Sequence, residues 1–206
     1  MKVIKPSAEV IKLIPKELIL QHIENCGRTC YKSEDKITQG SAEKFVKMIL
    51  NRGHETVIEH VSVSARVVCD RGVSHEIVRH RIASYSQEST RYVNYGGKDM
   101  EFIEPCWFNE SKTAQRDKNT WNSAMTLSED AYNILISNGW KPQYARSVLP
   151  NSLKTELVMT MNLREWRHFF KLRCAKAAHP QAREIAIDLL HQMQEYIPIV
   201  FDDFDY

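Results

Sequence analysis

The amino-acid sequence predicts an α+β fold in which helices flank a mainly antiparallel, curved sheet. Apolar and polar side chains alternate over residues 61–69 and again over residues 153–161, which is the period of a half-buried strand. Helical patterns lie before, between and after these stretches, without the regular strand–helix–strand rhythm of a dinucleotide-binding fold. The 206 residues contain no internal repeat and no linker rich in Gly or Ser, so we expect one domain spanning residues 1–206.

Two helices are expected before the first long strand. Pro15 can open the first helix, whose apolar residues recur on one face as far as Cys26, and Gly27 weakens its end. Ser41 is the expected N-cap of the second helix, and Gly53 stands where a C-terminal cap belongs.

Shorter elements are expected after the first long strand. Residues 70–72 are predicted to turn the chain, and Ser74 to cap a short helix that continues to Arg81. Residues 92–95 and 101–103 are candidate short strands on either side of a Gly-Gly turn.

Helices are predicted to dominate the C-terminal half. A long polar helix pattern covers residues 111–138, and Pro142 starts a brief helix. Asn162 can cap a helix that follows the second long strand and runs to Arg173. A last helix is expected over residues 180–196.

Composition limits the classes of function. The formal net charge is +2, so no bulk electrostatic field points to nucleic acid or to a membrane surface as a partner. No stretch approaches the length that spans a membrane, and the N-terminal residues lack the apolar core of a secretion signal. The five cysteines include no Cys-x-x-Cys pair. These features predict a cytoplasmic protein whose cysteines are free thiols.

The densest group of polar residues lies at residues 79–91, with three arginines and three serines. Guanidinium groups bind phosphate oxygens bidentately, and serine hydroxyls and turn amides add neutral donors. Arg79 and Arg81 flank His80, so on a helix or a strand they point in different directions and can serve two anionic ligands. The alternative interpretation of this segment is a solvated arginine-rich loop.

The same segment resembles the signature of flavin-dependent thymidylate synthases, which carry Arg-His-Arg, about seven residues, and then Ser-x-Arg. Here Arg79-His80-Arg81 is followed by seven residues and then by Ser89-Thr90-Arg91. Three flanking segments resemble other elements of the family in matching order, so that the resemblance spans roughly residues 10–200. These segments are residues 54–60, residues 145–150, and Asn162-Leu163-Arg164 with His168 and Arg173.

The resemblance implies an activity, its cofactors and an assembly. The family methylates dUMP to dTMP, with methylenetetrahydrofolate as the carbon donor and with FAD, reduced by NADPH, as the source of hydride. It forms homotetramers whose active sites lie at subunit junctions. The protein is thus expected to be a methyltransferase that uses FAD, with no nucleic-acid or membrane partner.

Roles for individual residues also follow from the resemblance. It implies that one set contacts the flavin: His54, Thr56, Arg79, His80, Arg81, Gln87, Asn162, Leu163, Arg164 and His168. It implies that a second set contacts dUMP: Glu76, Arg79, Gln87, Glu88, Ser89, Thr90, Arg91, Arg146 and Arg173. Many family members have Gln in place of Glu76, and Asn-Glu in place of Ser86-Gln87.

Arg173 is the residue that we expect to matter most for rate. The resemblance implies that it lies against the uracil edge. Methylation at C5 of uracil requires electron density at C5, and negative charge develops on the O4 and N3 side. A fixed guanidinium stabilises that charge without losing a proton. No side-chain nucleophile is then required.

Three alternatives remain open at this point. Pro105-Cys106 resembles the nucleophile of the folate-only thymidylate synthases, although a buried thiol is the simpler interpretation of Cys106. Several histidines could suggest a metal site, but no His-x-x-x-His pair lies on one helix with a suitable carboxylate, so none is predicted. Nucleic-acid binding would place the arginines on phosphates and Tyr85 and Tyr92 on bases.

Overall fold

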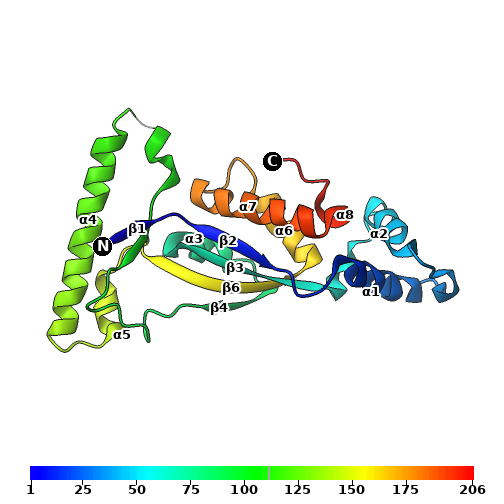
Figure 1. Cartoon of the computed structure of the whole chain (residues 1–206), viewed down its shortest axis with the longest axis horizontal. Helices are drawn as coiled ribbons and strands as arrows, with labels where there is room; N and C mark the ends of the chain where they lie inside the picture. Colours follow the sequence, from blue (N-terminus) through cyan, green and yellow to red (C-terminus); the bar gives the residue numbers. More distant parts are fainter. Residues whose placement is uncertain (111) are drawn as a thin grey trace.

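The computed structural model describes residues 1–110 and 112–206, and its centre is a four-stranded antiparallel sheet in the order β2-β3-β6-β4 (Figure 1). The strands are β2 (Ser7–Ile11), β3 (Ser62–Asp70), β6 (Lys154–Asn162) and β4 (Ala83–Gln87). The two long strands pair along their whole length, from Ser62 opposite Asn162 to Asp70 opposite Lys154. The prediction of an α+β fold with a mainly antiparallel sheet is confirmed.

A second sheet has two strands, β1 (Lys2–Ile4) and β5 (Glu101–Ile103), which pair in parallel. It lies at the end of the main sheet where α4 (Ala114–Ser137) stands upright in Figure 1. A small hydrophobic cluster joins these elements to α5 (Pro142–Ala145) through Phe102, Met125 and Tyr132.

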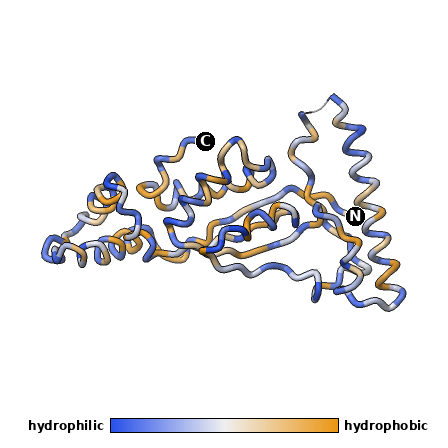
Figure 2. The backbone as a smooth tube through the Cα atoms, turned by 180° about the vertical axis from the view of Figure 1, so that it is seen from behind, coloured by the Kyte–Doolittle hydropathy of each residue, from blue (hydrophilic) through white to orange (hydrophobic). Residues whose placement is uncertain are grey.

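Helices α6 (Leu163–Arg173) and α7 (Pro180–Tyr196) cover one face of the main sheet (Figure 1). The alternating side chains of β3 and β6 face them, and Trp166 and Phe170 are fully buried beneath. Figure 2 shows hydrophobic residues along the central strands. Burial of this apolar face is the main source of stability for the layered fold.

Two helices extend the molecule beyond one end of the main sheet (Figure 1). Helices α1 (Lys16–Thr29) and α2 (Ser41–Asn51) pair at the end opposite α4 (Figure 1). Short elements complete the fold: α3 (Arg71–Ile77), α8 (Pro198–Phe201), and the 3-10 turns η1 (Glu34–Lys36), η2 (Glu55–His60), η3 (Cys106–Glu110) and η4 (Arg146–Val148).

Two predicted helix caps are wrong by a few residues. The N-cap of α2 is Gly40, in a left-handed conformation with φ of 79°, whereas Ser41 is the first helical residue. The Ser41 hydroxyl instead accepts a hydrogen bond from the Thr38 amide at 3.0 Å. The N-cap of α3 is Asp70, whose carboxylate accepts from the Val73 amide at 2.6 Å, and the predicted cap Ser74 lies inside the helix.

Several strand predictions also differ from the structure. Residues 92–95 form no strand, because the chain turns just before them: the amides of Tyr92 and Val93 both donate to the Ser89 carbonyl. Strands β1, β2 and β4 are too short and too polar to show a clear alternation, and their pairing with distant residues forms them. The predicted start of the long helix at Ser111 lies outside the described residues, and α4 begins at Ala114.

Within the part of the chain that the structure describes, none of the helices combines the length and the apolar character needed to cross a membrane.

Candidate active site

The segment of residues 79–81 continues the last turn of α3 and leads into β4. The Arg79 amide donates to the Glu76 carbonyl, and the His80 amide to the Ile77 carbonyl. From β4, the Tyr85 hydroxyl lies 2.7 Å from the His80 carbonyl oxygen and 2.9 Å from that of Ile77. Burial raises the pKa of Tyr85 to about 12, so its hydroxyl stays protonated and fixes this segment as a donor.

Side chains in this segment alternate between solvent and core. His80 is 5% exposed, whereas Arg79 and Arg81 are exposed. Neither arginine side chain forms a hydrogen bond or an ion pair with any residue that the structure describes. Both guanidinium groups are therefore free to meet anions, and whether they serve two different ligands stays a prediction.

The buried imidazole of His80 meets two partners that are distant in sequence. Its Nε2 accepts from the Arg173 Nε at 3.1 Å, and its Nδ1 lies 3.3 Å from the Glu165 carboxylate. Burial lowers the pKa of His80 to about 4, with the Arg173 charge as the next cause. His80 is therefore neutral near pH 7.

Arg173 ends α6, and its side chain is 19% exposed. Its terminal nitrogens donate to Glu76, at 2.7 Å to the carboxylate and at 2.9 Å to the backbone carbonyl. Together with the contact to His80, these bonds engage Nε and both terminal nitrogens of the guanidinium. The structure thus brings Glu76, His80 and Arg173 together, and it supplies the arginine partner that the Glu76 carboxylate needs.

The loop after β4 approaches Arg146 in η4. The Arg146 guanidinium donates to the hydroxyl of Thr90 at 3.3 Å. Arg91 is exposed and lies over the ring of Tyr92, 5.5 Å from its centroid. The Ser89 hydroxyl accepts from the Arg91 amide at 3.3 Å. Two guanidinium groups, two hydroxyls and turn amides therefore converge at this loop.

Gln87 and Glu88 are engaged inside the protein. The Gln87 amide nitrogen donates to Ser74 at 2.9 Å and to Thr155 at 3.1 Å. The Glu88 carboxylate accepts from Lys154 at 3.0 Å and from the Tyr95 hydroxyl at 2.7 Å. Both side chains support the loop. A ligand would therefore have to contact these two residues through atoms that these hydrogen bonds leave free, such as their backbone atoms.

Three of the residues expected at the flavin line a cavity of about 660 Å³ next to the start of α6. Asn162, Arg164 and His168 line it, together with Ile82 and residues of η2. Asn162 is the N-cap of α6, as predicted, and accepts from the Glu165 amide at 2.8 Å. Arg164 forms an ion pair with Glu59 at 2.6 Å.

The other residues expected at the flavin differ in exposure. His54 and Thr56 are exposed at the start of η2, beside Glu55, which lines the cavity. The Leu163 side chain is fully buried in the core, and its amide donates to the Val61 carbonyl. Leu163 therefore has only its carbonyl to offer a ligand.

His80, Glu165 and His168 also form a group whose possible metal-ligand atoms lie within 4.8 Å of one another. The chemistry of this group disfavours a cation, because both His80 nitrogens already have partners and one of these is a guanidinium.

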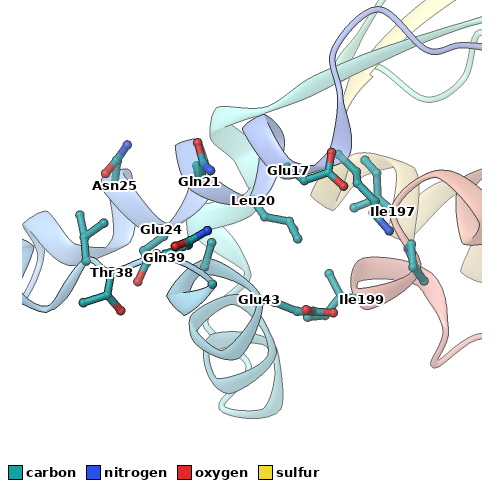
Figure 3. Close-up of a pocket in the computed structure, with 15 residues that line it drawn as sticks. Glu17, Leu20, Gln21, Glu24, Asn25, Thr38, Gln39, Glu43, Ile197 and Ile199 are labelled. Carbon is teal, nitrogen blue, oxygen red and sulfur yellow. The ribbon is translucent and has the colours of Figure 1, made fainter.

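A second cavity, of about 640 Å³, lies between α1, α2 and the start of α8 (Figure 3). Its buried carboxylate, Glu24, is already paired with Arg28 at 2.7 Å and with the Ser41 hydroxyl at 2.7 Å. None of the residues expected at the flavin or at dUMP lines this cavity. We therefore place the candidate site at residues 79–91 and α6.

Two functional candidates were missed by sequence reasoning, Glu165 and Tyr95, and Tyr85 was considered only as a residue that stacks on bases. Glu165 stands three residues after the cap Asn162, which is the spacing of a capping box and could have drawn attention to it. No local signal links Glu165 to His80, 85 residues away. Cys106 is partly buried, and burial raises the pKa of its thiol, which does not favour a nucleophilic thiolate.

Comparison with known proteins matches this arrangement to one family. The family model described as thymidylate synthase complementing protein matches residues 13–199. A structure of a UMP/dUMP methylase from Streptomyces cacaoi, bound with 5-Br dUMP, is similar in fold, with a TM-score of 0.81 at 22% identity. The similarity covers 98% of this chain and 96% of that one.

Curated relatives carry the name flavin-dependent thymidylate synthase. The relative from Geobacter sulfurreducens is 36% identical over 183 residues, which are 85% of this chain and 78% of the relative. The relative from Pyrococcus furiosus is 36% identical over 81% of this chain and 68% of its own length. That from Mycobacterium tuberculosis is 34% identical over 89% of this chain and 78% of its own length. The chain therefore belongs to the flavin-dependent thymidylate synthase family and is a flavin-using methyltransferase.

Proposed function

We propose that this chain methylates dUMP at C5 to give dTMP, with methylenetetrahydrofolate as the carbon donor and with FAD, reduced by NADPH, as the hydride source. The observation that carries the proposal is the fixed guanidinium of Arg173 beside the free arginines Arg79 and Arg81. One fixed and two free cations suit a reaction that binds phosphates and stabilises charge on a base.

For the nucleotide, the proposal uses the loop after β4. Arg91 and Arg146 supply two guanidinium groups for the phosphate, and Ser89 and Thr90 supply hydroxyls and amides. Glu88 and Gln87 hold the loop against β6 and α3. Glu76, with the Arg79 side chain beyond it, completes the group of residues proposed to contact dUMP.

For the flavin, the donor set fits a dinucleotide with a diphosphate. Arg79 and Arg81 have no anionic partner among the residues that the structure describes. Arg81 directly precedes Ile82, which lines a cavity together with Asn162, Arg164 and His168. The group proposed to contact the flavin also includes, through backbone or neighbouring atoms, His80, His54, Thr56, Gln87 and Leu163. FAD, when bound there, supplies the redox chemistry that the side chains lack.

Arg173 is the proposed catalytic residue. C5 of the uracil ring can attack the one-carbon unit only after it has become electron-rich, and the negative charge of that activated ring is shared with its O4 and N3 side. A guanidinium donates two parallel hydrogen bonds and keeps its charge at any physiological pH. Because Arg173 is already oriented by Glu76 and His80, little reorganisation is needed as that charge develops.

The proposal also covers assembly and location. Residues around the proposed flavin cavity are open to solvent in one chain, which fits a site completed by another subunit of a homotetramer. Residues 1–206 would then act as one catalytic domain. The cysteines in the described chain are all free thiols, which supports a reducing cytoplasm.

The test begins with a visible spectrum of the purified protein, followed by NADPH oxidation with and without dUMP. Bound flavin, oxidation stimulated by dUMP, and dTMP formed when methylenetetrahydrofolate is added would support every part of the proposal. A colourless protein that stays inert after addition of FAD would contradict it.

A further inference from the structure

The direct partners of the Arg173 guanidinium, His80 and Glu76, lie outside its own helix. Its Nε is held by His80, and behind His80 lies the carboxylate of Glu165, at the other end of α6. We propose that Glu165 is a positioning residue, which acts through His80 to hold the Arg173 guanidinium in the orientation used for methylation. The inference rests on the proposed function, because that function is what gives Arg173 its role.

The direction of each hydrogen bond is fixed by chemistry. A guanidinium has donors only, so the His80 Nε2 that faces the Arg173 Nε at 3.1 Å must be an acceptor without a proton. Neutral imidazole then carries its proton on Nδ1. That proton faces the Glu165 carboxylate at 3.3 Å. The chain of contacts therefore requires one tautomer of His80, and Glu165 is the acceptor that stabilises it.

Glu165 is itself fixed by the start of the helix. Its amide donates to the Asn162 side chain at 2.8 Å, and its own side chain is 10% exposed. A carboxylate in the first turn of a helix is favoured by the helix dipole. Glu165 is thus an acceptor attached to a rigid element, which is what a positioning residue requires.

Packing removes the other freedom of the imidazole. The His80 side chain is 3% exposed, and its ring lies edge-on to Phe169, with centroids 5.0 Å apart. Rotation of the ring within this space would exchange its nitrogen and carbon atoms and break both hydrogen bonds. The low pKa of His80 agrees with a neutral ring beside a cation.

Glu76 cannot do this work alone. Its side chain is 34% exposed, so solvent and any ligand of the site can compete for its carboxylate. The His80 side chain is 3% exposed, so its contact with the Arg173 Nε is shielded from such competition. Glu76 therefore contacts the two terminal nitrogens of the guanidinium, whereas His80, supported by Glu165, holds its Nε.

The test compares two substitutions in the flavin-loaded enzyme. In Glu165→Ala the Nδ1 proton loses its acceptor, so the other tautomer becomes available and its Nε2–H opposes the Arg173 Nε–H. We expect dTMP turnover to fall about tenfold or more, as is typical when a group that orients another is removed. In Glu165→Gln we expect most of the turnover to remain, because the Arg173 donor forces the amide to present its oxygen to Nδ1.

The matched control is Glu184→Ala, which removes another partly buried carboxylate, on α7. Glu184 is not among the residues of the proposed site, so its loss is expected to leave turnover unchanged. Flavin absorbance and the thermal midpoint are recorded for each variant. Wild-type turnover in Glu165→Ala would overturn the proposal, and so would an equal loss in Glu165→Gln.

A second measurement needs no variant and no activity. Wild-type protein labelled with ¹⁵N in histidine and arginine side chains should show one imidazole that is protonated at Nδ1, with its bare Nε2 coupled to an arginine Nε. The opposite tautomer, or an imidazolium, at that site would overturn the proposal even if Glu165→Ala does not fold. A wild-type enzyme that makes no dTMP would refute the proposed function alone, since this spectrum still tests the contact chain.

Discussion

The arginines of the candidate site are held in two different ways. Arg79, Arg81 and Arg91 are exposed, and their guanidinium groups form no hydrogen bond or ion pair with the residues that the structure describes. Arg173 has each of its nitrogens engaged, and one of its partners is buried. The first group is available to bind a mobile anion, whereas the second is already oriented before any ligand arrives.

The difference shows where each kind of cation is useful. An exposed guanidinium gains its partner only when a phosphate binds, so its contribution should appear as affinity. A guanidinium that is held in place can stabilise charge that appears during the reaction, so its contribution should appear as rate. The following predictions separate affinity from rate.

The largest effect is expected for Arg173→Ala. It removes the oriented cation, and turnover of dUMP should fall by about 10²- to 10³-fold, as for the loss of a donor that stabilises developing charge. The flavin spectrum should persist, and Arg173→Lys should recover little, because an ammonium cannot reproduce the fork that contacts Glu76 and His80. Normal turnover by a folded, flavin-loaded Arg173→Ala protein would contradict the role of Arg173 in rate.

The second arrangement, Arg173 with its partners Glu76 and His80 and with Glu165 behind His80, is called the buried group below. Its buried imidazole should also make stability depend on pH. The pKa of His80 is lowered from 6.5 to about 4, so below pH 6.5 the unfolded chain binds a proton that the folded chain does not. Stability from this group is complete above pH 6.5 and is lost as the pH falls toward 4. The titratable or charged groups that face the imidazole are Glu165, His168 and Arg173 from α6, and the Tyr85 hydroxyl from β4 contacts the backbone carbonyl of His80.

Urea unfolding at pH 7 and pH 4.5 measures this effect. Between these values the wild type should lose about 2 kcal/mol more free energy of unfolding than His80→Gln, which cannot titrate there. Because both proteins share every carboxylate and every other histidine, the difference isolates the His80 imidazole. Equal losses would mean that His80 is not held as a neutral ring.

The contrast between these groups explains how much of the site the sequence could predict. The exposed group lies within one segment, residues 79–91, where the density of arginine and serine is visible without any fold. The cap Asn162 and the end of α6 at Arg173 were also predictable from local signals. Local chemistry in a short segment is what a sequence shows directly.

The buried group depends on contacts between distant residues. Arg173 lies 93 residues from His80, and 97 from Glu76, so no period or spacing brings them together. The same holds for β4, whose residues Ala-Ser-Tyr-Ser-Gln have little strand character until they pair with β6. The sheet register brings α3, β4 and α6 into one place, and that register is set by long-range burial.

A smaller effect is expected for Arg91→Ala, in the exposed group. Loss of one charge-assisted contact to phosphate, worth about 1.5–3 kcal/mol, should raise the Kd for dUMP about tenfold or more with little change in the rate at saturation. The control is Arg116→Ala, which removes an equally exposed arginine from α4. An unchanged dUMP Kd in Arg91→Ala would remove this residue from the phosphate site.

The smallest effect is expected for Asn162→Ala, which removes the cap of α6. The Glu165 amide then loses its acceptor, and the free energy of unfolding of the flavin-free protein should fall by about 1 kcal/mol. Asn162→Asp keeps an oxygen acceptor at the same place and should restore most of that stability. Urea unfolding of the three proteins measures the difference.

The same variant tests how far the buried group depends on its helix. Without the cap, the Glu165 carboxylate should still be held by its contact with His80 and by the full burial of its neighbour Trp166. Turnover per flavin-loaded Asn162→Ala enzyme should therefore fall less than in Glu165→Ala. If the two variants lose turnover equally, the cap itself orients the carboxylate, and the preorganisation of Arg173 begins at Asn162 and continues through Glu165 and His80.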